Sequence, residues 1–270
     1  MSQYNFNLEQ LPVRSSRPRT NGVTMVMDKG ISLRQAEDFV SVSADFVDYV
    51  KLGFGTSLIT KNTREKVALY KKAGMKVFVG GTLFEAFVVR NQFDDYRRYI
   101  AELGLDSAEV SDGSIELSHE KKCEYISDLA KDYTVLSEVG SKEEGVIIHP
   151  ARWINMMQAE LEAGASKVIA EARESGTVGI YHKNGSAHTM LINRIVNKVK
   201  IENIIWETPQ KGQQAYFIKL FGCEVNLGNI GVDDVIPLET LRLGLRGDTF
   251  SHFLNMGTPQ QINGVVQKLD

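Results

Sequence analysis

Beyond residue 22, short apolar runs alternate with longer amphipathic segments, and this alternation repeats eight times. Short runs rich in Val, Ile and Met are typical of buried strands, whereas apolar residues at helical spacing indicate helices. Eight strand–helix units in about 230 residues match the usual size of a (β/α)8 barrel. The predicted strands cover residues 22–28, 48–54, 76–82, 107–112, 133–139, 166–173, 203–208 and 223–229.

The segments between these strands carry helix signals. The segment 62–74 ends at Gly74, and Pro150 stands in the first turn of the segment that it begins. An α/β doubly wound sheet is the alternative, but "MDKGISL" after the first strand is not the Gly-rich fingerprint expected there. The predicted helices cover residues 32–44, 62–74, 85–104, 118–133, 150–165, 187–199, 212–222 and 237–246.

The same rhythm predicts the domain limits. We expect an N-terminal arm over 1–21, a single (β/α)8 TIM barrel domain over 22–254 and a C-terminal tail over 255–270. The arm contains Arg14, Arg17 and Arg19, which could reach a neighbouring subunit. No repeat or linker suggests a second domain.

Charge and hydropathy exclude several partners. The formal net charge is −3, from 31 basic and 34 acidic residues, so neither nucleic acid nor an anionic membrane is expected as a partner. No apolar run approaches the roughly 18 residues that span a bilayer. We see no signal peptide at the N-terminus. The two cysteines, Cys123 and Cys223, lie far apart and fit a reduced, cytoplasmic protein.

Polar side chains gather at the C-terminal ends of the predicted strands, where the active sites of barrels lie. Because side chains alternate faces along a strand, Val50, Leu52 and Phe54 should face the helices while Lys51 points into the lumen. Unpaired buried charges are too costly to serve stability, so this rim predicts an active site. The strand-end set is Asp28, Lys51, Glu85, Glu109, Ser111, Asp112, Glu138, Lys142, Glu171, Arg173, Glu174, Glu207, Asn226 and Asn229.

This composition predicts a particular chemistry. Converging carboxylates are ligands for a hard cation such as Mg²⁺, and Lys or Arg beside a metal suits an anionic substrate. The loops after strands 7 and 8 bind phosphate in many barrels, and "NLGNIGVDD" offers backbone donors there. The residues expected to bind substrate or phosphate are Asp28, Ser175, Gly176, Asn226, Gly228 and Asn229.

Several strings resemble one known family. "DYVKLGFGTS", "EVSDGSIEL", "AGASKVIAEARESG" and "ETLRLGLRGDT" are similar to segments of phosphosulfolactate synthases, and the resemblance covers roughly residues 17–254. It implies a (β/α)8 barrel and a Mg²⁺-dependent lyase. That lyase adds sulfite to phosphoenolpyruvate and gives (2R)-O-phospho-3-sulfolactate. Family members are expected to be homo-oligomers, with a trimer as one candidate.

The resemblance also implies a mechanism. Sulfite would attack the methylene carbon, and Mg²⁺ would stabilise the resulting enediolate until a lysine protonates it. Lys51 and Lys142 are the candidate acids, and Arg173 would clamp an anionic group. The expected metal ligands are Glu109, Glu138 and Glu171.

Two alternatives stay open at this point. One is another metal-dependent lyase or aldolase that acts on a phosphorylated enolate. The other is a non-catalytic stress or heat-tolerance protein of the same fold, because plant heat-tolerance proteins resemble this family. The sequence does not name the downstream pathway, for which coenzyme M, sulfolactate and sulfonolipid precursors are all conceivable, nor does it give a role to "LRLGLRGDT".

Overall fold

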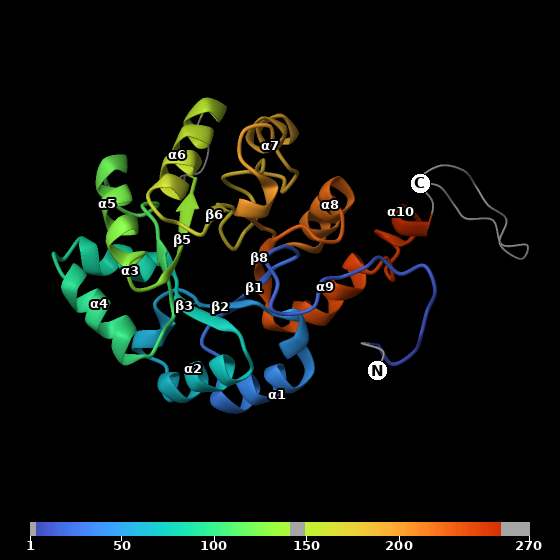
Figure 1. Ribbon diagram of the computed structural model, residues 1–270, viewed down its shortest axis with the longest axis horizontal. Coiled ribbons are helices and arrows are strands. Elements are labelled where there is room, and N and C mark those ends of the chain that lie inside the picture. Colours follow the sequence, from blue (N-terminus) through green and yellow to red (C-terminus); the bar gives the residue numbers. More distant parts are fainter. Residues whose placement is uncertain (1–3, 141–148, 255–270) are drawn as a thin grey trace, which may run out of the picture.

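The computed structural model describes residues 4–140 and 149–254, in which eight parallel strands form a barrel surrounded by helices (Figure 1). The predicted tail over 255–270 lies outside the described residues. The strands are β1 (Thr24–Asp28), β2 (Tyr49–Leu52), β3 (Lys76–Val79), β4 (Ser107–Val110), β5 (Thr134–Val139), β6 (Lys167–Ala170), β7 (Ile204–Glu207) and β8 (Leu227–Gly231). The α-helices are α1 (Leu33–Ser43), α2 (Thr63–Lys72), α3 (Gly81–Val88), α4 (Phe93–Glu102), α5 (His119–Leu129), α6 (Pro150–Glu162), α7 (Thr189–Val196), α8 (Lys211–Phe221), α9 (Val235–Arg242) and α10 (Phe250–Leu254).

A strand lies at each of the eight predicted places, although β8 begins at Leu227, four residues later than predicted. The sheet runs in the order β3-β2-β1-β8-β7-β6-β5-β4. Between β3 and β4, the two ends of this order, no backbone ladder joins the strands in the described residues. Two carboxylates bridge the seam instead. Asp106 Oδ1 accepts the N–H of Val77 at 3.1 Å, and Glu109 Oε1 accepts the N–H of Gly81 at 2.6 Å. The predicted (β/α)8 barrel is therefore confirmed, with one side closed by side chains.

The two faces of the strands bury different residues. Val50 and Leu52 pack under the helices as predicted, and Lys51 points into the lumen. Phe54 departs from the prediction because β2 ends at Leu52, and Phe54 lies beyond it with a positive φ of 55° and 55% exposure. An inner apolar cluster fills the lumen and consists of Val23, Met25, Tyr49, Phe78, Leu136, Ile169 and Ile205.

The single helix predicted over 85–104 is wrong, because α3 ends at Val88 and α4 begins at Phe93. Asn91 lies between them with a φ of 56°, a left-handed conformation that an α-helix cannot continue through. Aromatic side chains join the two helices, with the rings of Phe84 and Tyr96 5.5 Å apart. None of the described helices is long and apolar enough to cross a membrane.

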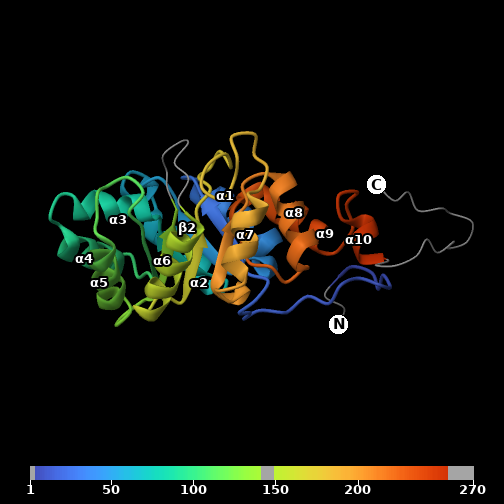
Figure 2. The same cartoon turned by 90° about the horizontal axis from the view of Figure 1, so that it is seen from above.

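The N-terminal segment packs on its own barrel and runs beside α9 (Figure 2). The buried Arg14 donates to Glu239 on α9 at 2.8 Å. Arg17 and Arg19 both lie beside Asp48, with Arg19 Nε 3.1 Å from its carboxylate. These three arginines were expected to reach a neighbouring subunit, but they bind groups of their own chain.

The segment "LRLGLRGDT" also has a structural role. Arg242 is fully buried and donates to the backbone carbonyls of Val23 and Val225, at the N-terminal ends of β1 and β8. Burial lowers the pKa of Arg242 to about 9. Asp248 forms an exposed pair with Lys211 at 3.0 Å. Arg242 thus ties the C-terminal end of α9 to the barrel end opposite the strand-end carboxylates.

We predict that Arg14→Ala lowers the free energy of unfolding by about 3 kcal/mol, because it leaves Glu239 buried without its cation. Urea denaturation measures this loss. The matched control is Arg64→Ala, which removes an exposed pair with Glu102 and should cost less than about 1 kcal/mol. Equal losses in the two variants would contradict the anchoring role of Arg14.

Candidate active site

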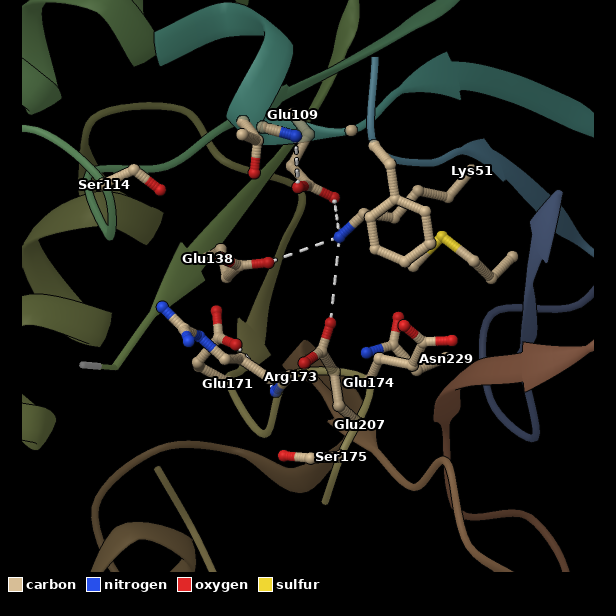
Figure 3. A pocket seen from close by; sticks show the side chains of 15 residues that line it. Lys51, Glu109, Ser114, Glu138, Glu171, Arg173, Glu174, Ser175, Glu207 and Asn229 are labelled. Carbon is tan, nitrogen blue, oxygen red and sulfur yellow. Dashed lines mark hydrogen bonds and ion pairs between the residues drawn. The ribbon is translucent and has the colours of Figure 1, made fainter. Parts of the chain in front are cut away.

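A pocket of about 360 Å³ opens at the C-terminal ends of the strands (Figure 3). Charged side chains reach it from β2, β4, β5 and β7 and from the end of β6. The lining residues are Met27, Lys51, Phe54, Gly80, Gly81, Thr82, Glu109, Ser114, Glu138, Glu171, Arg173, Glu174, Ser175, Glu207 and Asn229. The pocket thus lies at the end of the barrel where the sequence predicts the active site.

Lys51 lies among the pocket carboxylates (Figure 3). Its Nζ is 2.9 Å from Oε2 of Glu109, 3.3 Å from Oε2 of Glu138 and 3.7 Å from Oε1 of Glu207. Burial alone would lower the pKa of Lys51, but these three carboxylates outweigh it and raise the pKa well above its ordinary value. The buried lysine is therefore a charged, compensated group of the site.

Glu109 has two partners, one at the seam between β3 and β4 and the other Lys51. One of its oxygens accepts the N–H of Gly81 at the start of α3, and the other faces the Lys51 ammonium. Burial raises the pKa of Glu109 despite the attraction of Lys51. Both oxygens are thus already used within the protein.

A different set of carboxylates could hold a metal ion. Glu138, Glu171 and Glu207 are buried, and each offers an oxygen within 4.8 Å of the others'. The prediction had named Glu109 in place of Glu207. Glu207 lies two residues after the inward-facing Ile205 of β7, just as Glu171 lies two residues after Ile169 of β6. Strand parity therefore predicts that Glu207 also points inward. Burial raises the pKa of Glu207 to about 7, and the Glu138 carboxylate adds to the shift.

The backbone after β6 orients two of these three acids. Glu171 Oε1 accepts the N–H of Arg173 at 2.7 Å, and Glu207 Oε2 accepts the N–H of Ala172 at 2.9 Å. Arg173 has a left-handed φ of 55°, which turns the chain at this point. The turn therefore fixes two carboxylates of the candidate metal group and also presents Arg173 to the pocket.

Asn229 supplies a further oxygen at the pocket. The residue is only 8% exposed, yet its Oδ1 has no hydrogen-bond partner among the described residues. A buried orphan carbonyl is the kind of group that ligand or metal binding satisfies. The donor set of three carboxylates and a nearby amide oxygen suits a hard cation such as Mg²⁺.

Two of the residues in the loop after β6, Glu174 and Ser175, line the pocket, whereas Gly176 does not. Ser175 lines the pocket as expected, and Glu174 pairs with Lys29 from the loop after β1. Gly176 is absent from the described lining. A Cβ there would lie 2.6 Å from the side chain of Gln213 on α8. Gly176 thus allows the loop to pack closely on α8.

Asp28, predicted to bind substrate, faces the helix layer. Its carboxylate accepts from Lys66 Nζ at 2.7 Å and from the hydroxyl of Tyr70 at 3.0 Å, both on α2. Strand parity explains this, since Met27 of the same strand lines the pocket. Lys142, the second candidate acid, lies outside the described residues.

Two other predicted substrate-binding residues do not line the pocket in the described chain. Asn226 lies at the opposite end of the barrel, where it accepts the N–H of Val23 at 3.0 Å and donates to the carbonyl of Ile204 at 3.1 Å. A Cβ on Gly228 would lie 2.5 Å from Met25, so Gly228 makes room for the inner apolar cluster.

Glu85 shapes the pocket wall without entering the pocket. Its carboxylate accepts from the Ser111 hydroxyl and from the N–H groups of Gly113 and Ser114, at 3.1 and 2.8 Å for the last two. Ser114 lines the pocket. Glu85 therefore fixes the loop after β4.

The sequence model of the (2R)-phospho-3-sulfolactate synthase (ComA) family matches residues 12–248. The chain belongs to this family. It is 41% identical over 248 residues to a phosphosulfolactate synthase of Bacillus subtilis, with 91% of this chain and 98% of the relative covered. It is 42% identical over 245 residues to one of Methanothermobacter thermautotrophicus, with 88% and 95% covered. These matches indicate an enzyme and confirm the family predicted from the motifs.

A solved structure supports the barrel. A 3-hexulose-6-phosphate synthase matches with a TM-score of 0.51 and 17% identity, over 82% of this chain and 98% of that one. At this identity the likeness concerns the fold alone.

We predict that Gly81→Ala lowers the free energy of unfolding by about 1–3 kcal/mol, because the new Cβ would lie 2.3 Å from Ser111 Oγ and 2.8 Å from Glu109 Oε1. Thermal and urea denaturation measure the loss. Gly212→Ala is the control, since its Cβ meets nothing within 4 Å. A Gly81→Ala protein as stable as this control would contradict the close packing of α3 against Glu109 and Ser111.

Proposed function

We propose that this chain is a phosphosulfolactate synthase that adds sulfite to phosphoenolpyruvate, forming a C–S bond and yielding (2R)-O-phospho-3-sulfolactate. Family membership supports this proposal. The observation that carries it is one pocket that combines a buried lysine, a group of three carboxylates and an arginine. Such a pocket suits an anionic substrate with a metal ion.

The proposed cofactor is Mg²⁺, held by Glu138, Glu171 and Glu207, and Asn229 lines the same pocket. When bound, the ion would supply positive charge for the negative charge that develops on the substrate. The carboxylates hold this position because backbone N–H groups orient Glu171 and Glu207. Glu109 is not a proposed metal ligand, because its oxygens already face Lys51 and the N–H of Gly81.

The proposed acid is Lys51. Sulfite uses its lone pair to form the bond to the methylene carbon, and the adjacent carbon must then take up a proton. Lys51 carries a proton at the pocket wall and would deliver it, after which solvent restores the ammonium. Lys142, which follows β5 in the sequence and lies outside the described residues, stays the second predicted acid.

Arg173 and Ser175 are the proposed contacts for anionic groups of the substrates. Both line the pocket, and no ion pair involving the Arg173 guanidinium is present among the described residues. A guanidinium can bind a carboxylate, phosphate or sulfite through paired hydrogen bonds. Asn229 offers its amide to the same pocket.

The relatives are named synthases in three organisms, which favours catalysis over a stress-protein role. No observation favours a different lyase. We propose the cytoplasm as the location, because Cys123 and Cys223 are both free thiols and fit a reducing compartment. Assembly into a homo-oligomer, with a trimer as one candidate, stays a prediction that light scattering can test.

Purified protein with sulfite, phosphoenolpyruvate and Mg²⁺ should consume both substrates, and Lys51→Met should lower turnover by about 10²- to 10⁴-fold because the acid is lost. Circular dichroism checks that the variant is folded. The control, Lys211→Met, removes only an exposed pair with Asp248 and should keep its rate. Near-full turnover by Lys51→Met would remove Lys51 from the mechanism.

Metal binding can be measured separately with Mn²⁺ and electron paramagnetic resonance. Glu171→Gln should weaken Mn²⁺ binding at least about tenfold, because it removes a proposed ligand. Glu174→Gln, a change of the same kind at the pocket edge, lies outside the metal group and should bind Mn²⁺ like the wild type. Unchanged affinity in Glu171→Gln would place the metal elsewhere.

A further inference from the structure

Lys122 is a fully buried lysine outside the barrel lumen. It belongs to α5, and its Nζ lies 3.0 Å from Glu160 Oε1, 3.0 Å from Asp112 Oδ1 and 2.6 Å from the backbone carbonyl of Glu138. The last contact connects the helix layer to a proposed metal ligand. Burial disfavours the charge of Lys122, but the two carboxylates more than compensate, and its pKa is raised.

The Glu138 carbonyl lies where strand pairing with β4 stops. The β4–β5 ladder ends at the pair Val110 and Ser137, one residue before Glu138. Lys122 donates to the carbonyl just beyond this end. A contact of 2.6 Å to a charged donor is a strong restraint on the backbone that carries the Glu138 side chain.

The same lysine holds the neighbouring loop and helix. Asp112 belongs to the loop after β4, and Glu160 belongs to α6 and also accepts the Ser137 hydroxyl at 2.6 Å. His119 Nε2 lies 3.3 Å from Glu160 at the partly exposed edge of this cluster. One buried cation thus joins β5, α6 and the loop after β4.

We propose that Lys122 is a positioning residue that sets the Glu138 backbone, and through it the geometry of the metal group Glu138, Glu171 and Glu207. This inference rests on the proposed metal site. Replacing a group that orients a metal ligand typically costs about 10- to 100-fold in metal affinity. Lys122 itself neither lines the pocket nor contacts a reacting atom.

The chain contains a matched control for this role. Lys66 on α2 is also a buried lysine in the helix layer, only 1% exposed, and it pairs with Asp28 at 2.7 Å. Removing either lysine leaves a buried carboxylate unpaired, so both changes should reduce stability. Of these two helix-layer lysines, Lys122 contacts a residue of the proposed metal group, whereas Lys66 contacts Asp28.

The experiment titrates wild-type protein, Lys122→Met, Lys66→Met and Glu171→Gln with Mn²⁺ and follows the free ion by electron paramagnetic resonance. Melting curves are recorded for each protein without metal. We expect Lys122→Met to weaken Mn²⁺ binding about 10- to 100-fold and Lys66→Met to change it less than about twofold, although both melt earlier.

Two results would overturn the inference alone, given that the wild type binds Mn²⁺ and Glu171→Gln binds it more weakly. One is wild-type affinity in Lys122→Met, and the other is an equal loss in Lys66→Met. A wild-type protein that binds no Mn²⁺ would instead overturn the metal site and this inference together. The two failures are therefore distinguishable.

If Lys122→Met does not fold, the same titration uses the double variant Lys122→Met with Glu160→Gln. This pair leaves no fully buried carboxylate unpaired, because Asp112 keeps 17% of its side chain exposed. The expected loss of Mn²⁺ affinity is the same, since the Glu138 carbonyl again lacks its donor. Its control is Glu160→Gln alone, which keeps Lys122 and should bind Mn²⁺ more tightly than the double variant.

Discussion

The open end of this barrel depends on the balance of charge around one buried ammonium. Lys51 can stay charged inside the lumen because carboxylates from β4, β5 and β7 lie within 4 Å of it. Those carboxylates in turn tolerate burial partly because the ammonium is there. Each charged group therefore needs the others, and the strands that carry them must keep their register for the pocket to exist.

The surrounding structure maintains that register by specific polar contacts. Glu109 closes the seam between β3 and β4, where backbone pairing is missing from the described strands. Outside the lumen, Lys66 and Lys122 bind Asp28 and the Glu138 carbonyl, at the C-terminal ends of β1 and β5. The pocket is thus supported from the helix layer as well as from within, which is how a site keeps ligands in place before substrate arrives.

Strand parity predicted the inward side chains well, including Lys51, Glu138 and Glu171, because alternation along a strand is a local rule. Parity also explains why Asp28 faces the helices, since Met27, the residue before it on β1, faces the pocket. Parity could not choose among inward acids. Glu109 and Glu207 both point inward from the C-terminal end of a strand. What separates them is the tertiary structure, in which the N–H of Gly81 across the seam binds Glu109.

The sequence by itself determined the family, the eight strand–helix units and the ring of charges at one end, since these follow from motifs and periodicity. Tertiary structure alone decided which acids meet as a group, which glycines make room for packing, and that the N-terminal arginines bind their own chain. The physical reason is that these outcomes depend on distances between residues far apart in sequence, which strands and helices fix only after they pack into the closed barrel.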